Sequence, residues 1–412
     1  MAAIIFYGRG TPQKTQCTGA AASVIICRAP ERQTTLIGGL NQSMSIRALI
    51  FPTNTGQGHK CAALAVKEYL DTREGVDIRI LDVLDIGRQK SGFYGGLYDG
   101  VVNRVPWFFG ALYSLAEHIT SSKRHSPIYM MNTLYTGAFR KMIEEQKPDV
   151  IVCPHMFSAH SVTRLIEKHG LKVPTVGILT DYTCSPFWEE MRLDRSIVAN
   201  QAVADECAAK GMDRNRLVPT GIPVSARFNR KIPKAEARAA FKIKKETVFA
   251  VMGGSMGYGK ITELSAELAR RRPDAEIIAV CGTNAAVYGK TRSIENVTAL
   301  QFIDNVDVLM DAADVVLTKP GGLSTTEAMT KRVPLVITMP IPGGEARNAE
   351  HIAGLGMARS ANTVKDACDA ACALLADPRA RQAMIEAQEK NCSVNAARDA
   401  GELIIELAGK NL

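Results

Sequence analysis

The stretch TVFAVMGGSMGYGKITELSAELARR, residues 247–271, decides the fold class of this 412-residue chain. It begins with a mostly apolar run, turns through four glycines, and continues with apolar residues at helical spacing. A buried strand, a glycine-rich turn and a helix in this order form a βα unit of a parallel sheet. We expect the helix to begin near Gly257, which would leave backbone N–H groups around Ser255 free to bind a phosphate.

Two familiar phosphate motifs fit this loop only in part. Gly254 to Lys260 spells G-x-x-x-x-G-K, but Ile261 stands where a P-loop places the Ser or Thr that holds Mg²⁺. The dinucleotide pattern G-x-G-x-x-G is not matched either. A turn whose glycines serve only the backbone stays open as the structural alternative.

Strands and helices alternate on both sides of this loop. The runs DVIVC and TVGIL suit strands that are buried on both faces. The stretch 220–238, which is rich in proline and charge, interrupts the alternation and indicates a linker. We therefore expect an extension at 1–43, a first domain at 44–222, a linker at 223–245, a second domain at 246–392 and a C-terminal helix at 393–412.

The expected elements follow from the apolar periods. Strands are expected at 46–52, 77–82, 149–153, 174–179, 195–199, 217–219, 247–252, 276–281, 297–300, 314–318 and 334–338. Helices are expected at 59–71, 96–119, 128–147, 159–169, 201–210, 257–271, 305–312, 323–331, 346–354, 363–376, 379–390 and 395–409.

Composition argues against several classes of protein. The formal charge of +8 is moderate and no basic module stands out, so we expect no nucleic-acid partner. No apolar run approaches the length of a membrane span. The ten cysteines are scattered and the histidines lack metal-ligand spacing, so we expect reduced thiols and no metal site. Residues 1–43 lack the order of a signal peptide and precede Met44, a natural start, so they are interpreted as a flexible extension or a misassigned start.

A second glycine-rich turn, TNTGQGHK at 53–60, carries a histidine that the first lacks. An unperturbed imidazole pKa near 6.5 makes His59 a candidate general base, with helix capping or packing as the alternative. Asp181 and His155 each follow a predicted strand. Asp181 is a candidate for orienting a substrate or His59, or for capping a turn. His155 is a candidate for lining a substrate cleft at the ends of the strands.

A third motif, KPGGLSTTE at 319–327, ends another buried strand. Glu327 falls in the first turn of the next helix, where a carboxylate can complement the helix dipole or accept the hydroxyls of a ribose. In PGGEARNAE, residues 342–350, Glu345 and Asn348 open a further helix. We expect both side chains to point into the crevice at the carboxyl ends of the strands.

Together these motifs resemble glycosyltransferase family 28. GGSMG, DNVDVLMDAADVVLTKPGGLSTTEA and PIPGGEARNA resemble the donor half of that family. TNTGQGHKCAA, TDYTCSPFWEEMRLDRSIVAN and VPTGIPVSARF resemble the branch of monogalactosyldiacylglycerol synthases and processive diacylglycerol glucosyltransferases. The resemblance spans roughly residues 45–392. Gln57 departs from it by occupying a glycine position, and TCSPFW lacks a histidine that the branch often carries after TDY.

The resemblance implies an α/β chain of the GT-B fold, in which two Rossmann-like domains face a central cleft. It implies a UDP-sugar as co-substrate, no cofactor, no bound metal and inversion at the anomeric carbon. On the donor side it implies Gly254 and Ser255 at the diphosphate, Phe302 and Ile303 at the uracil, Thr325 and Thr326 as further phosphate contacts, Glu327 at the ribose, and Glu345 and Asn348 at the sugar. The residues expected on the acceptor side are Gly56, Gln57, Gly58, Trp107 and His155, with His59 and Asp181 as the catalytic pair.

Residues 93–142 are rich in aromatic and basic side chains, and Trp107 lies among them. Such a surface can rest on anionic lipid without spanning it, with ordinary packing as the alternative. We expect a peripheral protein on the cytoplasmic face of a membrane that transfers a hexose from a UDP-sugar to a lipid acceptor, first of all diacylglycerol. The alternatives are a glycosyltransferase for another lipid-linked acceptor such as a cell-wall precursor, a UDP-sugar epimerase, and an inactive UDP-sugar-binding protein. The sequence does not choose the sugar, the processivity or the oligomeric state.

Overall fold

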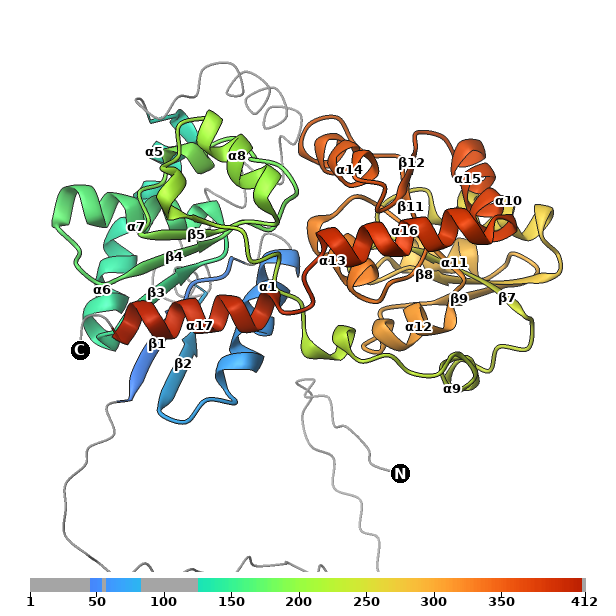
Figure 1. Ribbon diagram of the computed structural model, residues 1–412, viewed down its shortest axis with the longest axis horizontal. Helices are drawn as coiled ribbons and strands as arrows, with labels where there is room; N and C mark the ends of the chain where they lie inside the picture. The colour runs from blue at the N-terminus through green and yellow to red at the C-terminus, as the bar shows by residue number, and fades with distance from the viewer. Residues whose placement is uncertain (1–44, 54–56, 83–124, 410–412) are drawn as a thin grey trace, which may run out of the picture. The chain divides into compact units, whose positions relative to one another are not determined.

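The computed structural model of the protein describes residues 45–53, 57–82 and 125–409, all of which belong to one compact unit (Figure 1). In this described part, no helix is long and apolar enough to cross a membrane.

Three parts of the sequence-based prediction lie outside the described residues. They are the extension at 1–43, the loop residue Gly56, and the stretch 96–119 with Trp107.

The first half of the unit is a six-stranded parallel sheet in the order β2-β1-β3-β4-β5-β6. Its strands are β1 Ile46–Ile50, β2 Val76–Ile80, β3 Val150–Cys153, β4 Thr175–Ile178, β5 Arg195–Ile197 and β6 Leu217–Val218. Its helices are α1 Gln57–Leu70, α5 Pro127–Asn132, α6 Thr136–Gln146, α7 Met156–His169 and α8 Gln201–Ala209, with the short 3-10 helices η1 Thr133–Tyr135, η2 Trp188–Glu190 and η3 Arg214–Arg216. Every residue of β3 and β4 is buried, as their continuous apolar runs predict.

The second half is another six-stranded parallel sheet, in the order β12-β11-β10-β7-β8-β9. Its strands are β7 Thr247–Met252, β8 Ala275–Val280, β9 Val297–Leu300, β10 Val315–Thr318, β11 Leu335–Thr338 and β12 Arg359–Ala361. Its helices are α10 Ile261–Arg271, α11 Ala285–Thr291, α12 Val306–Ala312, α13 Gly322–Thr330, α14 Gly344–Gly354, α15 Val364–Ala376 and α16 Pro378–Asn391. The two sheets with their helices confirm the predicted α/β class of two Rossmann-like halves.

The ends of the second half connect the halves in two ways. Within the stretch predicted as a linker, the chain forms a short 3-10 helix, η4 Ala226–Asn229, and the helix α9 Lys234–Ala240. The last helix, α17 Ala396–Gly409, returns to the first half, where it packs against α1 and β1 (Figure 1). Its apolar side chains share a core with those strands, so the first sheet is completed by the far end of the chain.

Several element boundaries differ from the prediction for local reasons. The helix expected at 128–147 is divided into α5, η1 and α6, and α7 begins before 159 because the His155 ring caps it by accepting the Phe157 N–H. The short elements β12, α9 and α11 carry too few residues for a clear apolar period and were not predicted.

The helix after the second-half glycine loop begins at Ile261, not near Gly257 as predicted. Gly257 has φ of 62°, a left-handed value outside the helical region. A Cβ atom there would lie 2.0 Å from the Cys281 carbonyl oxygen, so only glycine fits. The turn from Gly253 therefore closes on itself before the helix starts, with Tyr258 N donating to Gly253 O at 3.0 Å.

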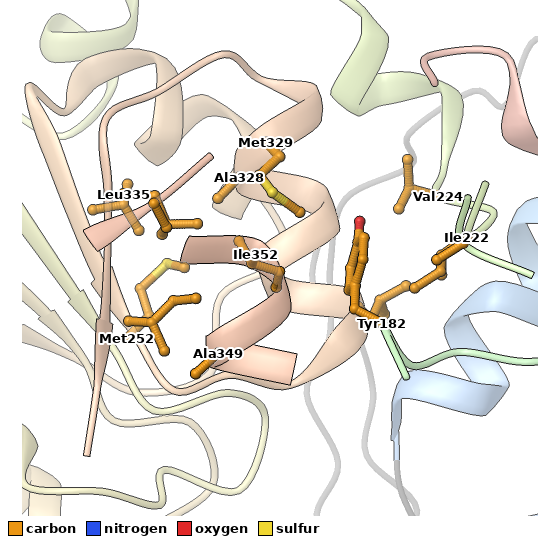
Figure 2. Close-up of a cluster of buried hydrophobic side chains, with 14 of the residues drawn as sticks. Tyr182, Ile222, Val224, Met252, Ala328, Met329, Leu335, Ala349 and Ile352 are labelled. Carbon is orange, nitrogen blue, oxygen red and sulfur yellow. The ribbon is translucent and has the colours of Figure 1, made fainter. Parts of the chain in front are cut away.

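One hydrophobic cluster runs through both halves. It joins side chains of the first sheet to those that cover the second sheet. Tyr182, which follows β4, is among its largest buried members. Figure 2 shows the Tyr182 ring together with Ile222, Val224, Met329 and Ile352, which belong to the same cluster. Burial of this surface holds the halves in contact next to the carboxyl ends of the strands.

Candidate active site

Each sheet reverses its strand order at one point. In the first sheet β1 lies between β2 and β3, and in the second β7 lies between β8 and β10. Open α/β sheets bind ligands outside the carboxyl ends of their strands at such switch points. The loops after β1, β3, β7 and β10 are therefore where the fold offers a site.

A cavity of about 400 Å³ is bounded in the first half by the start of α1 and the residues after β4, and in the second half by the loops after β7, β8, β9 and β10. Its size falls in the range of small-molecule sites. Of the predicted residues, those that line it are Gly58, His59, Asp181, Gly254, Ser255, Phe302, Ile303 and Glu327. Donor-side and acceptor-side residues that are far apart in the sequence thus share one cavity.

The first turn of α13 contributes backbone to the cavity wall. Gly321, Gly322 and Ser324 line it, whereas α10 begins only after the glycine loop has left it. Of the two helices that follow glycine turns in the second half, α13 and not α10 therefore has the positive end of its dipole next to the cavity. The glycine loop is hydrogen-bonded to the residues that follow β8, since the Ser255 carbonyl accepts the Thr283 N–H at 2.8 Å.

Lys319 supplies a cation between the two glycine-rich turns. It ends β10, lines the cavity, and its Nζ lies 3.3 Å from Glu345 Oε1. Its Cε lies 3.4 Å from the point where a Cβ of Gly254 would stand, so any side chain on that glycine would crowd the lysine. Glu345 is thereby placed as a partner of Lys319, and it does not line the cavity in the described structure.

Glu327 faces the cavity from α13 without a hydrogen bond to its carboxylate from any described residue. Burial raises its pKa to about 8, and the nearby Asp307 carboxylate acts in the same direction, while the Arg227 guanidinium opposes both. Arg227 reaches the wall from η4 and donates to the Asp304 carbonyl oxygen. A ligand that donates hydrogen bonds to this buried carboxylate would offset the free-energy cost of its burial.

His59 stands near the start of α1 with its ring orientation set by two neighbours. Its Nδ1 lies 3.0 Å from the Pro154 carbonyl oxygen and 2.9 Å from Thr180 Oγ1. Because a carbonyl only accepts, the contact assigns the proton to Nδ1 and leaves the lone pair on Nε2. Burial lowers the pKa of His59, and the Asp181 carboxylate and the Pro154 carbonyl partly offset this effect.

The other two acceptor-side candidates support His59 from different directions. The His155 ring packs edge-on against it, with ring centroids 4.5 Å apart, and does not line the cavity. Asp181 lines the cavity and accepts hydrogen bonds from Ser185 Oγ at 3.0 Å and from Asn348 Nδ2 at 2.9 Å. His155 thus caps α7 and packs against His59. Asp181 lines the same cavity as His59, and two hydrogen bonds fix its carboxylate.

Three further predicted donor residues turn away from the cavity wall. The Thr325 and Thr326 side chains are buried and donate to the carbonyls of Gly321 and Gly322. The Asn348 amide is buried against Asp181 and the Tyr182 N–H. For Gln57, the structure describes its place at the start of α1.

The sequence analysis missed two cationic wall residues. Lys319 stands inside the quoted K-P-G-G motif, and its place directly after a buried strand and before a glycine turn was the available signal. Arg227 comes from the linker, and only the approach of η4 to α13 brings it to the site. No local pattern points to it.

Two family models match the chain. Residues 59–224 match monogalactosyldiacylglycerol (MGDG) synthase, and residues 248–391 match the glycosyltransferase family 28 C-terminal domain. The fold and the shared cavity define a protein of the GT-B class. The first half of the chain is thus similar to the MGDG synthases, and the second half to the C-terminal domain of glycosyltransferase family 28.

Curated relatives resemble the chain in sequence, and a solved structure resembles it in fold. The chain is 28% identical to the processive diacylglycerol β-glucosyltransferases of Staphylococcus saprophyticus, over 60% of this chain and 64% of the relative, and of Bacillus pumilus, over 59% and 65%. It therefore spans a little under two thirds of the length of these relatives. A solved structure of the glycotransferase of kitacinnamycin is 17% identical, with a TM-score of 0.63 and coverage of 88% of this chain and 99% of that chain, which shows the fold.

Proposed function

We propose that the protein is a hexosyltransferase that moves a sugar from a UDP-sugar to diacylglycerol by a single inverting displacement. The observation that carries the proposal is the cavity that joins His59 to Glu327, with a cation and a helix N-terminus beside them. The names of the relatives and the family models support the lipid acceptor. A separate UDP-sugar epimerase is disfavoured because the names of the relatives give a lipid acceptor, and an inactive binding protein is disfavoured because it needs no base in the cavity.

Binding of the donor is proposed for the second half. In this proposal the Glu327 carboxylate accepts both ribose hydroxyls, which would replace the hydrogen bonds that it lacks among the described residues. The exposed Phe302 and its neighbour Ile303 line the same wall and offer a backbone edge to the uracil. The α13 N-terminus and the glycine loop offer N–H groups to the diphosphate.

The chemical step is proposed for His59. The acceptor hydroxyl gives its proton to His59 Nε2 while its oxygen bonds to the anomeric carbon, and the bond from that carbon to the UDP oxygen breaks. Attack from the face opposite the leaving group inverts the anomeric centre. A base of lowered pKa stays neutral at physiological pH and is therefore ready to take the proton.

The leaving UDP gathers negative charge, which this chain is proposed to balance with its own groups and without a metal or other cofactor. Lys319 and the α13 N-terminus lie on the donor wall, and preorganised donors of this kind stabilise developing charge. Peripheral action at the cytoplasmic face of an anionic membrane is likewise part of the proposal, supported by the acceptor that the relatives' names give. Vesicle flotation with and without anionic lipid tests that part.

The test of the proposed reaction is turnover with each of several UDP-sugars and vesicles that contain diacylglycerol, read by mass spectrometry of the lipid. We expect a hexosyl-diacylglycerol, and we expect His59→Gln to lose turnover by about 100-fold or more while UDP binds as before. Equal turnover of that variant would remove His59 as the base. Product on a different lipid, with no product on diacylglycerol, would leave a glycosyltransferase of another acceptor.

A further inference from the structure

The Asn348 side chain is fully engaged at the contact between the two halves. Its Nδ2 donates to Asp181 Oδ1 at 2.9 Å and to the Pro320 carbonyl at 3.3 Å, and its Oδ1 accepts the Tyr182 N–H at 2.8 Å. An amide nitrogen carries two hydrogens, so both have a partner. With 2% of its surface exposed, Asn348 is not free to donate to a sugar hydroxyl unless it first releases Asp181.

Asp181 receives this bond at the edge of the cavity. Its second oxygen accepts from Ser185 Oγ at 3.0 Å, so both carboxylate oxygens are held. Asp181 follows β4 in the first half, whereas Asn348 lies on α14 in the second. The carboxylate beside His59 is therefore oriented by one donor from its own half and by one from the opposite half.

We infer that Asn348 is a positioning residue, which holds the Asp181 carboxylate toward His59 when the halves are in contact. This inference rests on the proposed function and deepens it: it assigns Asn348 to the base and not to the donor sugar. The base is then fully assembled only when the half that carries the donor has docked. Transfer to water from an open state would be disfavoured for the same reason, since the base would be incompletely held.

The charge that Asn348 positions acts on His59 together with other groups. Those that adjoin His59 in the chain, contact its ring or line the same cavity are Lys60 and Cys61 on α1, His155 before α7, Asp181 after β4, Arg227 on η4, and Tyr258, Asp304, Lys319 and Glu327 in the second half. Of these, Asp181 is the one whose charge raises the His59 pKa against burial. If Asp181 is no longer held, the His59 pKa should therefore fall.

The experiment compares Asn348→Ala and the near-isosteric Asn348→Leu with a matched control, Tyr182→Phe. The control removes another hydrogen bond between the halves, Tyr182 Oη to Thr326 Oγ1 at 2.9 Å, without contact with Asp181. We expect both Asn348 variants to lower kcat by about 10- to 100-fold and to leave the KM for the UDP-sugar within about threefold. The acid limb of the kcat profile should move to lower pH, and the control should keep the wild-type profile.

A second readout does not depend on turnover. NMR titration of histidines labelled at Cε1, with the His59 signal identified by its loss in His59→Gln, should give a lower His59 pKa in both Asn348 variants than in the wild type and the control. Thermal melting and UDP binding show whether each variant is folded. If the wild type has no turnover with diacylglycerol, the proposed function fails, and the NMR titration still decides the inference.

Two results would overturn it. A raised KM for the UDP-sugar, or altered discrimination between UDP-glucose and UDP-galactose, with kcat and acid limb unchanged, would assign Asn348 to the sugar. An unchanged His59 pKa in both folded Asn348 variants would show that the amide does not position the charge.

Discussion

Replacement of Gly322 by alanine should separate the two halves and stop transfer while each half stays folded. Gly322 begins α13, and a Cβ at this position would lie 1.8 Å from the Thr180 carbonyl oxygen. Thr180 follows β4 in the first half, next to Asp181. The clash is between a Cβ and a backbone carbonyl oxygen, so rotation of a side chain cannot relieve the contact.

The displacement follows from the distances. A carbon needs about 3.3 Å from a carbonyl oxygen, so the two backbones must part by about 1.5 Å. A misplacement of about 1 Å at reacting groups can lower a rate by about 100-fold. We therefore expect kcat of Gly322→Ala to fall by about 100-fold or more, which corresponds to about 2.7 kcal/mol of transition-state stabilisation.

The assay measures kcat with UDP-sugar and diacylglycerol vesicles, together with UDP affinity and circular dichroism. The control is Gly354→Ala, another glycine-to-alanine change in a helix of the second half, where the added Cβ would have no heavy atom within 4 Å. It should keep full turnover and gain about 0.5–1 kcal/mol of stability from helix propensity. If Gly322→Ala retained turnover within threefold of the wild type, the halves would not need the contact seen at Thr180, and the reasoning would fail.

Three further predictions concern charge. Because burial lowers the pKa of His59, the acid limb of kcat should have its midpoint below pH 6.5, and a midpoint above that value would exclude His59 as the titrating base. The pKa of Glu327 is raised from 4.5 to about 8 in the folded state, so below pH 4.5 both states bind the proton and Glu327 does not lower stability. As the pH rises from 4.5 through 8, the unfolded state loses the proton first, and the free energy of unfolding falls. Glu327→Gln should thus raise the melting temperature of the ligand-free protein at pH 8 by the equivalent of about 1–3 kcal/mol, and weaken UDP binding; an unchanged melting temperature would contradict this. Lys331→Met should cost about 3–5 kcal/mol in urea unfolding, since it leaves the buried Asp311 carboxylate without its ion partner, and a loss below 1 kcal/mol would show that the pair is dispensable.

The sequence predicted the sheets well, because parallel strands buried on both faces carry apolar runs with no competing interpretation. It also found the two glycine loops and Glu327, whose spacing follows from the local βα unit. It misplaced the start of α10, since Gly257 looks like a helix residue until the Cys281 carbonyl 2.0 Å from its missing Cβ is known. Short elements such as α11 escaped because seven residues do not complete a recognisable period.

The part of the site that the sequence could not reveal lies where the halves meet. Asn348 and Glu345 have the same local setting at the start of α14, and both were assigned to the sugar. The structure separates them by their neighbours: Glu345 pairs with Lys319 of its own half, and Asn348 with Asp181 of the other half. No helical period encodes the second contact, because it depends on how closely Gly322 lets α13 approach Thr180.

The same contact explains why a glycine and an asparagine are required at positions that do not contact the donor in the described structure. Gly322 lets α13 approach the Thr180 carbonyl, and at this approach Asn348 Nδ2 lies 2.9 Å from Asp181 Oδ1. A base that is oriented across the contact makes proton removal conditional on docking of the half proposed to bind the donor. Gly322→Ala and Asn348→Ala should therefore have kcat losses that are not additive, because each breaks the same Asp181 contact. A double variant that loses the product of the two single effects would instead show that approach and orientation act independently.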